Sequence, residues 1–211
     1  MPRRAIRCEP GEFYHVYNRG ANRGPIFFQP DHYLFFLRRL RQKLVGEKYN
    51  AEDSKSVGPA AEVSDTSPHV TVVAYCLMPN HYHLLLRVES NHFSERMQAF
   101  GTSYSKAINK QIGRSGTLFE GRFQAKHVDQ ESYLLHLSRY IHLNPVAARL
   151  VRQPAEWEFS SYREYLAIRA GTLPCPQIVL GEFSSREHYR RFVESKPSET
   201  AASIDHLLFE E

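Results

Sequence analysis

The stretch from residue 69 to residue 88 constrains the fold more than any other part of the sequence. Residues 69–78, HVTVVAYCLM, form a long run rich in β-branched and other apolar side chains, which predicts a buried strand. Pro79 and Asn80 then predict a turn, and residues 81–88, HYHLLLRV, predict the strand that returns beside the first. The chain is therefore expected to be built around an antiparallel hairpin whose strands lie in the core.

The remaining elements follow from apolar periodicity and from capping residues. Before the hairpin, the sequence predicts a strand over 12–19 and a helix from Pro30 to about Gly46. After it come a helix that Asn91 caps and that ends near Ile112, and then a loop and strand over 117–128. Asp129 caps a further helix that Pro145 closes or kinks, and a helical stretch around 157–170 precedes a weakly ordered, acidic end. This order, β-α-β-β-α-β-α, predicts an α+β fold in which an antiparallel sheet has helices packed on one face, of the ferredoxin-like type.

The chain is expected to form one domain with appendages. With 211 residues, 42% of them hydrophobic, it can bury one sizeable core but is short for two. Residues 1–170 are assigned to this domain and residues 171–211 to a C-terminal extension with an acidic tail. Residues 47–68, rich in Ala, Ser, Glu, Asp and Pro, are predicted to be a flexible inserted loop.

The sequence favours a cytoplasmic protein. It contains no run of about eighteen apolar residues, and its arginine-containing start is not followed by the apolar run of a signal peptide. The three cysteines, Cys8, Cys76 and Cys175, are widely spaced and form no CxxC pair. This spacing argues against a disulfide framework and against a cysteine zinc site, and it suits a reducing compartment.

Charge is divided unevenly along the chain. The net charge is +4, but the end from Glu194 to Glu211 carries −4 and the rest carries +8. Basic residues gather in residues 1–46 and 101–126, where aromatic residues are interleaved with them. A basic surface with aromatic side chains suits a ligand rich in phosphates and stackable bases, although a solvated charged face fits the charge equally well.

His81 and His83 are the first candidate site residues. The period of two along a strand places both imidazoles on one face of the sheet and Tyr82 and Leu84 on the other. Two neutral imidazoles side by side can form half of a divalent-metal site. Taken alone, such a pair fits a structural or surface role better, but here it lies in a strand of the core, where polar groups need partners.

Tyr140 and Asn144 form the second candidate pair. Because they are four residues apart in a predicted helix, they lie on one helix face. An amide oxygen can complete a metal site of mixed nitrogen and oxygen ligands, and a tyrosine one turn earlier would point at the same bound phosphate. On their own the two residues fit equally simple roles, a core tyrosine and an asparagine that ends a helix before proline.

Four blocks of the sequence, taken together, resemble the REP-associated tyrosine transposases, relatives of the single-strand HUH transposases. They occur in the expected order within roughly residues 12–165: HVYNRGANRGPIF, VVAYCLMPNHYHLLLRV, GRSGTLFEGRFQAK and SYLLHLSRYIHLNPVAARLV. The resemblance implies an HUH endonuclease fold for the domain. It places the HUH motif on His81, Tyr82 and His83, the nucleophile on Tyr140, and the third metal ligand on Asn144.

The reaction implied by the resemblance is the cleavage and rejoining of single-stranded DNA through a 5′-phosphotyrosine. Tyr140 would act as nucleophile, and His81 and His83 would act with it by holding Mg²⁺ or Mn²⁺ together with Asn144. The implied substrate is a hairpin-forming, REP-type repeat. No nucleotide cofactor is expected, because the phosphotyrosine keeps the energy of the broken bond and the sequence has no GxxxxGK[ST] loop.

Several other residues are candidates for DNA contact or compete for the catalytic roles. The predicted DNA contacts, mostly to phosphate, are Asn18, Arg19, Arg23, Arg114, Arg122 and Lys126. Tyr133 lies seven residues before Tyr140 on nearly the same helix face. Four residues after Tyr133, however, stands Leu137, whereas Tyr140 is followed at that spacing by the amide of Asn144. His136 could approach Tyr140, and His142 flanks it, whereas His15 and His69 are interpreted as ordinary strand or loop residues.

Three alternatives compete with the transposase hypothesis. A DNA-binding regulator that does not cleave would keep the fold and be indifferent to metal. A plasmid relaxase or replication initiator would use the same chemistry but carries further domains, for which 211 residues leave little room. A structural metal site would need a fourth ligand, which the sequence does not offer. We expect a monomer acting in cis, with a dimer as the open alternative.

Overall fold

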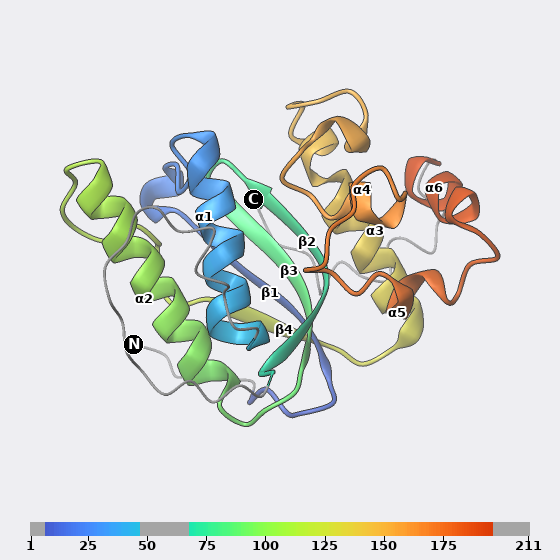
Figure 1. The fold of residues 1–211 in the computed structure, drawn as a ribbon, viewed down its shortest axis with the longest axis horizontal. Coiled ribbons are helices and arrows are strands. Elements are labelled where there is room, and N and C mark those ends of the chain that lie inside the picture. The colour runs from blue at the N-terminus through green and yellow to red at the C-terminus, as the bar shows by residue number, and fades with distance from the viewer. Residues whose placement is uncertain (1–6, 47–67, 196–211) are drawn as a thin grey trace.

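The structure, a computed structural model, describes residues 7–46 and 68–195. Four strands form one antiparallel sheet: β1 (Phe13–Arg19), β2 (Val70–Met78), β3 (His81–Val88) and β4 (Gln124–Val128). Their spatial order is β2-β3-β1-β4, so the predicted hairpin occupies one side of the sheet and β1 inserts between β3 and β4 (Figure 1). Residues 47–67 of the predicted inserted loop and the tail from residue 196 lie outside the described residues.

The helices connect and follow these strands. They are α1 (Pro30–Leu40), which continues as a π-helical turn over Arg41–Val45, α2 (Phe93–Gln111), α3 (Glu131–Ala147), α4 (Tyr162–Tyr165), α5 (Gln177–Leu180) and α6 (Arg186–Glu194). Short 3₁₀ turns occur at Ala21–Arg23 and Pro154–Glu156. Within the ranges that the structure describes, no helix is both long enough and apolar enough to cross a membrane.

The predicted α+β class and antiparallel sheet are confirmed, but the helices cover both faces of the sheet. On one face α1 and α2 pack over a core that includes Phe36, Phe100 and Leu84. On the other face α3 and the C-terminal helices pack over a second core that includes Leu85 and Leu137 (Figure 1). The reason is that β2 and β3 are buried along nearly their whole length, so both of their faces need cover.

Three helices have boundaries that differ from the prediction. α2 and α3 begin after His92 and Gln130, one residue beyond the predicted caps Asn91 and Asp129. Pro145 lies inside α3, which continues for two more residues. The predicted helix around residues 157–170 contains only the four residues of α4.

The C-terminal part of the described chain is more ordered than predicted. Residues 171–195, expected to be weakly ordered, contain α5 and α6, and Tyr189 and Val193 of α6 are fully buried. The sequence of α6 is mostly charged, and only its apolar stripe identifies it as a helix that needs a partner. That partner is α3, so the described part of the extension packs directly on the domain.

Candidate active site

Strand β3 carries the two candidate histidines on the face that α3 covers. Tyr82 and Leu84 point to the α1–α2 core, as the alternation predicted, while His81 and His83 point the other way. His83 lies opposite Tyr17 of β1 and is fully buried. Its burial, and after it electrostatic repulsion from His15 and His81, lower the pKa of His83 well below its usual range. His83 is therefore a neutral imidazole at pH 7, the form that binds a metal.

Asn144 of α3 meets both histidines. Its Oδ1 lies 3.3 Å from Nε2 of His81, and its side chain also lies beside that of His83. On the other side of the His81 ring, Nδ1 lies 2.7 Å from Oδ1 of Asn80. Because that oxygen can only accept, Nδ1 of His81 carries the proton, and Nε2 presents its lone pair towards Asn144.

His15 of β1 supports His83 from the adjacent strand. Nε2 of His15 lies 3.0 Å from Nδ1 of His83, and the two rings are stacked with centroids 5.2 Å apart. Both imidazoles are fully buried. Metal-binding histidines in proteins commonly use their second ring nitrogen for such a contact, which fixes the ring orientation and the tautomer.

Tyr140 completes the cluster from α3. Its ring stands edge-on to His83, with centroids 5.4 Å apart, and edge-on to His15, with centroids 6.1 Å apart. The residue is half-buried, so one side of it is open to solvent. Tyr133 lies seven residues earlier, roughly 10 Å along the helix axis, and is therefore displaced from His83 by about two turns.

The donor set fits a divalent cation. Nε2 of His81 and Oδ1 of Asn144 face each other with lone pairs, an arrangement that favours a cation between them. Within the described ranges, no three His, Cys, Asp or Glu side chains form a cluster that could hold a metal ion. The amide of Asn144 lies beside Nε2 of His81, and Asn144 is the residue to which the resemblance assigns the third ligand.

Two polar hollows flank the cluster. The first, of about 530 Å³, is lined by Tyr17, Asn18, Arg19, Glu120, Gly121, Arg122, Gln124 and Lys126. The second, of about 360 Å³, is lined by Arg19, Arg23, Met78, Pro79, Asn80, His81, Ala148 and Leu150. Arg19 lines both hollows, and its guanidinium forms an ion pair with Glu120 through Nε and Nη2.

The predicted DNA contacts are brought together with one exception. Asn18, Arg19, Arg122 and Lys126 line the first hollow, and Arg23 lines the second. Arg114 lines neither hollow and donates instead to the carbonyl oxygen of Thr117 in the turn after α2. Asn18 also has a structural role, because its side chain accepts a hydrogen bond from the amide of Arg19 and donates one to the carbonyl oxygen of Gly121.

The two histidines that flank Tyr140 in sequence point towards the C-terminal part of the chain. The His136 ring lies 5.4 Å from the ring of Phe192 in α6. His142 is fully buried and hydrogen bonds to Tyr189 and Ser161. The burial of His142 lowers its pKa to about 3, so it is neutral at pH 7.

Sequence reasoning overlooked His15, Tyr17 and Asn80. His15 and Tyr17 alternate in β1 and so share a sheet face, a signal that the sequence contains. That this face meets His83 depends on the pairing of β1 with β3, which lies about seventy residues away in sequence and cannot be read locally. Asn80 was interpreted only as a turn residue, whereas its side chain also binds His81.

The chain is similar to known transposases in sequence and in fold. The model of the IS200-like transposase family matches residues 32–144, which include all the candidate catalytic and metal-binding residues. A Haemophilus influenzae protein named as a REP-associated tyrosine transposase is 26% identical over 101 residues, which cover 43% of this chain and 57% of that protein. This chain thus aligns with little more than half the length of that relative.

A solved structure extends the likeness of the fold. The structure of a REP-associated tyrosine transposase bound to a REP hairpin superposes with a TM-score of 0.59 at 15% identity, covering 82% of this chain and 93% of the other. At this identity the superposition concerns the fold. The family model, by contrast, matches more than half of the sequence. The chain belongs to the family of IS200-like transposases.

Proposed function

We propose that the chain is a metal-dependent endonuclease and strand transferase that acts on hairpin-forming, REP-type single-stranded DNA. The observation that carries the proposal is the contact between Tyr140 and His83 beside Asn144 and His81. A tyrosine able to form a phosphotyrosine thus lies against a donor set suited to a divalent cation. The solved structure with this fold is described as bound to a REP hairpin, which supports the choice of DNA.

The chemistry proposed for Tyr140 is an in-line displacement at phosphorus. The tyrosine oxygen forms a bond to the phosphorus atom and the bond to the 3′ oxygen breaks, which leaves a 5′-phosphotyrosine and a free 3′ hydroxyl. The tyrosine loses one proton and the leaving oxygen gains one, so protons balance. Attack by a 3′ hydroxyl on the phosphotyrosine reverses the step and joins strands without a nucleotide cofactor.

The surrounding side chains bind and orient the scissile phosphate. Mg²⁺ or Mn²⁺ on His81, His83 and Asn144 would neutralise the charge of that phosphate. The neighbouring phosphates would contact Arg19, Arg122 and Lys126 in the first hollow and Arg23 in the second. Tyr140 lies against His83 of its own chain, which is the arrangement that a monomer acting in cis needs.

The proposal is tested by trapping the covalent intermediate. Hairpin oligonucleotides taken from the DNA next to the gene, with a label at the 3′ end, are mixed with the protein and Mn²⁺ and resolved on a denaturing gel. The label must be at the 3′ end because the fragment with the 5′ phosphate stays on the tyrosine. We expect a labelled band of protein size that is lost in Tyr140→Phe and with EDTA but retained in Tyr133→Phe.

Two outcomes would contradict the proposal. An adduct that persists in Tyr140→Phe and disappears in Tyr133→Phe would move the nucleophile to Tyr133. Binding of the hairpin by wild-type protein without any adduct, with either Mg²⁺ or Mn²⁺, would favour the DNA-binding regulator that does not cleave.

A further inference from the structure

Helix α3 has a second polar face, directed away from the candidate active site. Tyr140 and Asn144 are separated by about 40° around the helix axis, whereas His142 lies about 160° from each of them. Ser138, Arg139 and His142 are all buried, and each contacts the C-terminal segment, defined here as residues 154–195. Burying a polar side chain costs free energy unless it is paired, so these three residues depend on their partners in the C-terminal segment.

The hydroxyl of Tyr189 is the centre of these contacts. It lies 2.7 Å from Nδ1 of His142 and 3.1 Å from Oγ of Ser138. Ser138 Oγ also donates to the carbonyl oxygen of Leu135 over 2.7 Å. Burial raises the pKa of Tyr189 well above its usual value, so the hydroxyl keeps its proton and remains able to donate or accept a hydrogen bond here.

The other nitrogen of His142 extends the chain of hydrogen bonds to the sheet. Nε2 of His142 lies 2.8 Å from Oγ of Ser161, which also donates to the carbonyl oxygen of Tyr75 in β2 over 3.2 Å. Ser161 Oγ in turn accepts from the backbone amide of Tyr75 in β2 over 2.9 Å. One chain of donors and acceptors therefore runs from β2 through His142 in α3 to Tyr189 in α6, and back to α3.

A second link joins α3 to the end of α6. The Arg139 guanidinium donates through Nε to the carbonyl oxygen of Val193 over 3.1 Å and through Nη2 to the carbonyl oxygen of Ser195. It also lies over the ring of Phe192, 5.8 Å from the centroid. Arg139 directly precedes the candidate nucleophile, so this link acts on the same helix turn as Tyr140.

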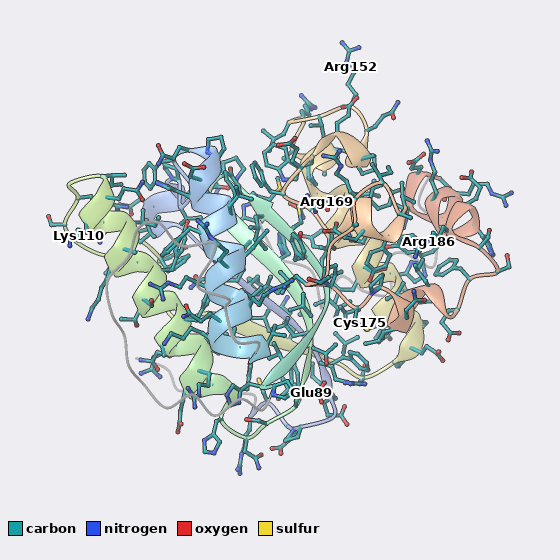
Figure 2. The ribbon with its side chains drawn as sticks, viewed as in Figure 1. Glu89, Lys110, Arg152, Arg169, Cys175 and Arg186 are labelled. Atoms are coloured by element: carbon teal, nitrogen blue, oxygen red, sulfur yellow. The ribbon has the colours of Figure 1, made fainter. Side chains whose placement is uncertain are left out.

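The C-terminal segment is itself fastened to β2. Its residues Tyr165 and Trp157 donate to the carbonyl oxygens of Val73 and Leu77 over 3.1 Å and 2.9 Å, and the amide of Cys175 donates to the carbonyl oxygen of Val72 over 2.7 Å. Arg169, labelled with Cys175 in Figure 2, forms an ion pair with buried Glu164 and donates to the hydroxyl of Tyr75. The segment therefore connects β2 to α3 as a brace.

We infer that Tyr189 and His142 are positioning residues for the reaction, because they fix the rotation of α3 and thereby the place of Tyr140 and Asn144 over the histidines. The inference rests on the proposed function. A side-chain tip roughly 6 Å from the helix axis moves by about 1 Å when the helix turns by about 10°. A displacement of about 1 Å can lower the rate of a reaction by about 100-fold.

The structure offers a matched pair of variants for the test. Tyr189→Phe and Tyr165→Phe each remove one hydroxyl from a fully buried tyrosine of the C-terminal segment. The Tyr189 hydroxyl contacts α3, whereas the Tyr165 hydroxyl donates to the β2 backbone. Three quantities are measured on the full chain: the melting temperature, amide hydrogen exchange over residues 138–146, and single-turnover formation of the DNA adduct with Mn²⁺.

We expect both variants to lose similar thermal stability. Tyr189→Phe alone should exchange faster over residues 138–146 and form adduct at least about tenfold more slowly, with unchanged affinity for the hairpin. Ser161→Ala, which removes the hydrogen bond to the other nitrogen of His142, should behave like Tyr189→Phe. Equal exchange and equal adduct rates in the two Tyr→Phe variants would overturn the inference. Faster exchange in Tyr189→Phe, when wild-type protein forms no adduct, would support the link to α3 and overturn only the proposed function.

Discussion

Replacing His15 by Leu tests whether the buried histidine beside His83 supports a metal site. If Nε2 of His83 is the ligand, Nδ1 of this neutral ring carries the proton and donates to Nε2 of His15, 3.0 Å away. Leu fills a similar volume but accepts no hydrogen bond. The variant therefore leaves the Nδ1 proton of His83 without its partner from β1 in a fully buried position.

The expected loss of metal affinity follows from this contact. Removing one partner of a buried hydrogen bond costs about 1–3 kcal/mol. Removing the hydrogen-bond partner of a metal-binding histidine lowers metal affinity by about 10–100-fold, which corresponds to about 1.4–2.7 kcal/mol. The two ranges agree, so we expect the affinity for Mn²⁺ to fall by about 10–100-fold in His15→Leu. His15→Gln, which keeps an acceptor oxygen, should recover part of the loss.

The assay is a calorimetric titration with Mn²⁺, accompanied by thermal denaturation. His69→Leu is the control, because His69 is also buried and also hydrogen bonds to another side chain, the hydroxyl of Ser90, but it precedes β2 at the far end from His81. His69→Leu should lower stability and leave Mn²⁺ affinity unchanged. The reasoning is refuted if His15→Leu binds Mn²⁺ within twofold of wild type while losing the same stability as the control.

Two further predictions concern the DNA surface and the core. Glu120→Gln removes the acidic partner of Arg19 from the first hollow, so single-stranded DNA should bind more tightly, and the slope of log K against log salt should steepen by up to about 0.7. Fluorescence anisotropy over a salt series measures this slope, and an unchanged slope would argue against a phosphate at Arg19. Phe100→Ala empties a fully buried position between α2 and the sheet and should cost about 3–5 kcal/mol of unfolding free energy in urea, whereas a loss below about 1 kcal/mol would contradict close packing there.

The parts of the site that local spacing defines could be predicted from the sequence. The period of two along β3 placed His81 and His83 on one sheet face, and the structure has them there. The spacing of four in α3 placed Tyr140 and Asn144 on one helix face. These relations involve at most four residues of chain, so secondary structure alone determines them.

The parts that depend on long-range pairing could not be predicted in this way. His15 looked like an ordinary strand residue, because its contact with His83 requires that β1 insert beside β3. The second core was missed although the sequence contained a signal for it, since an uninterrupted apolar run such as that of β2 indicates burial on both faces. The role of His142 likewise became apparent only when α6, a mostly charged helix, was placed against α3.

The path of the chain explains how a single helix can be held so firmly over the histidines. In the order β2-β3-β1-β4, the strands that carry His81, His83 and His15 are the two central ones. Helix α3 follows β4 after two connecting residues, so peptide bonds fix its start at one edge of the sheet. The C-terminal segment then ties the same helix to β2 at the opposite edge. A helix fastened at both edges must cross the central strands, and this places Tyr140 and Asn144 above the histidines of their own chain.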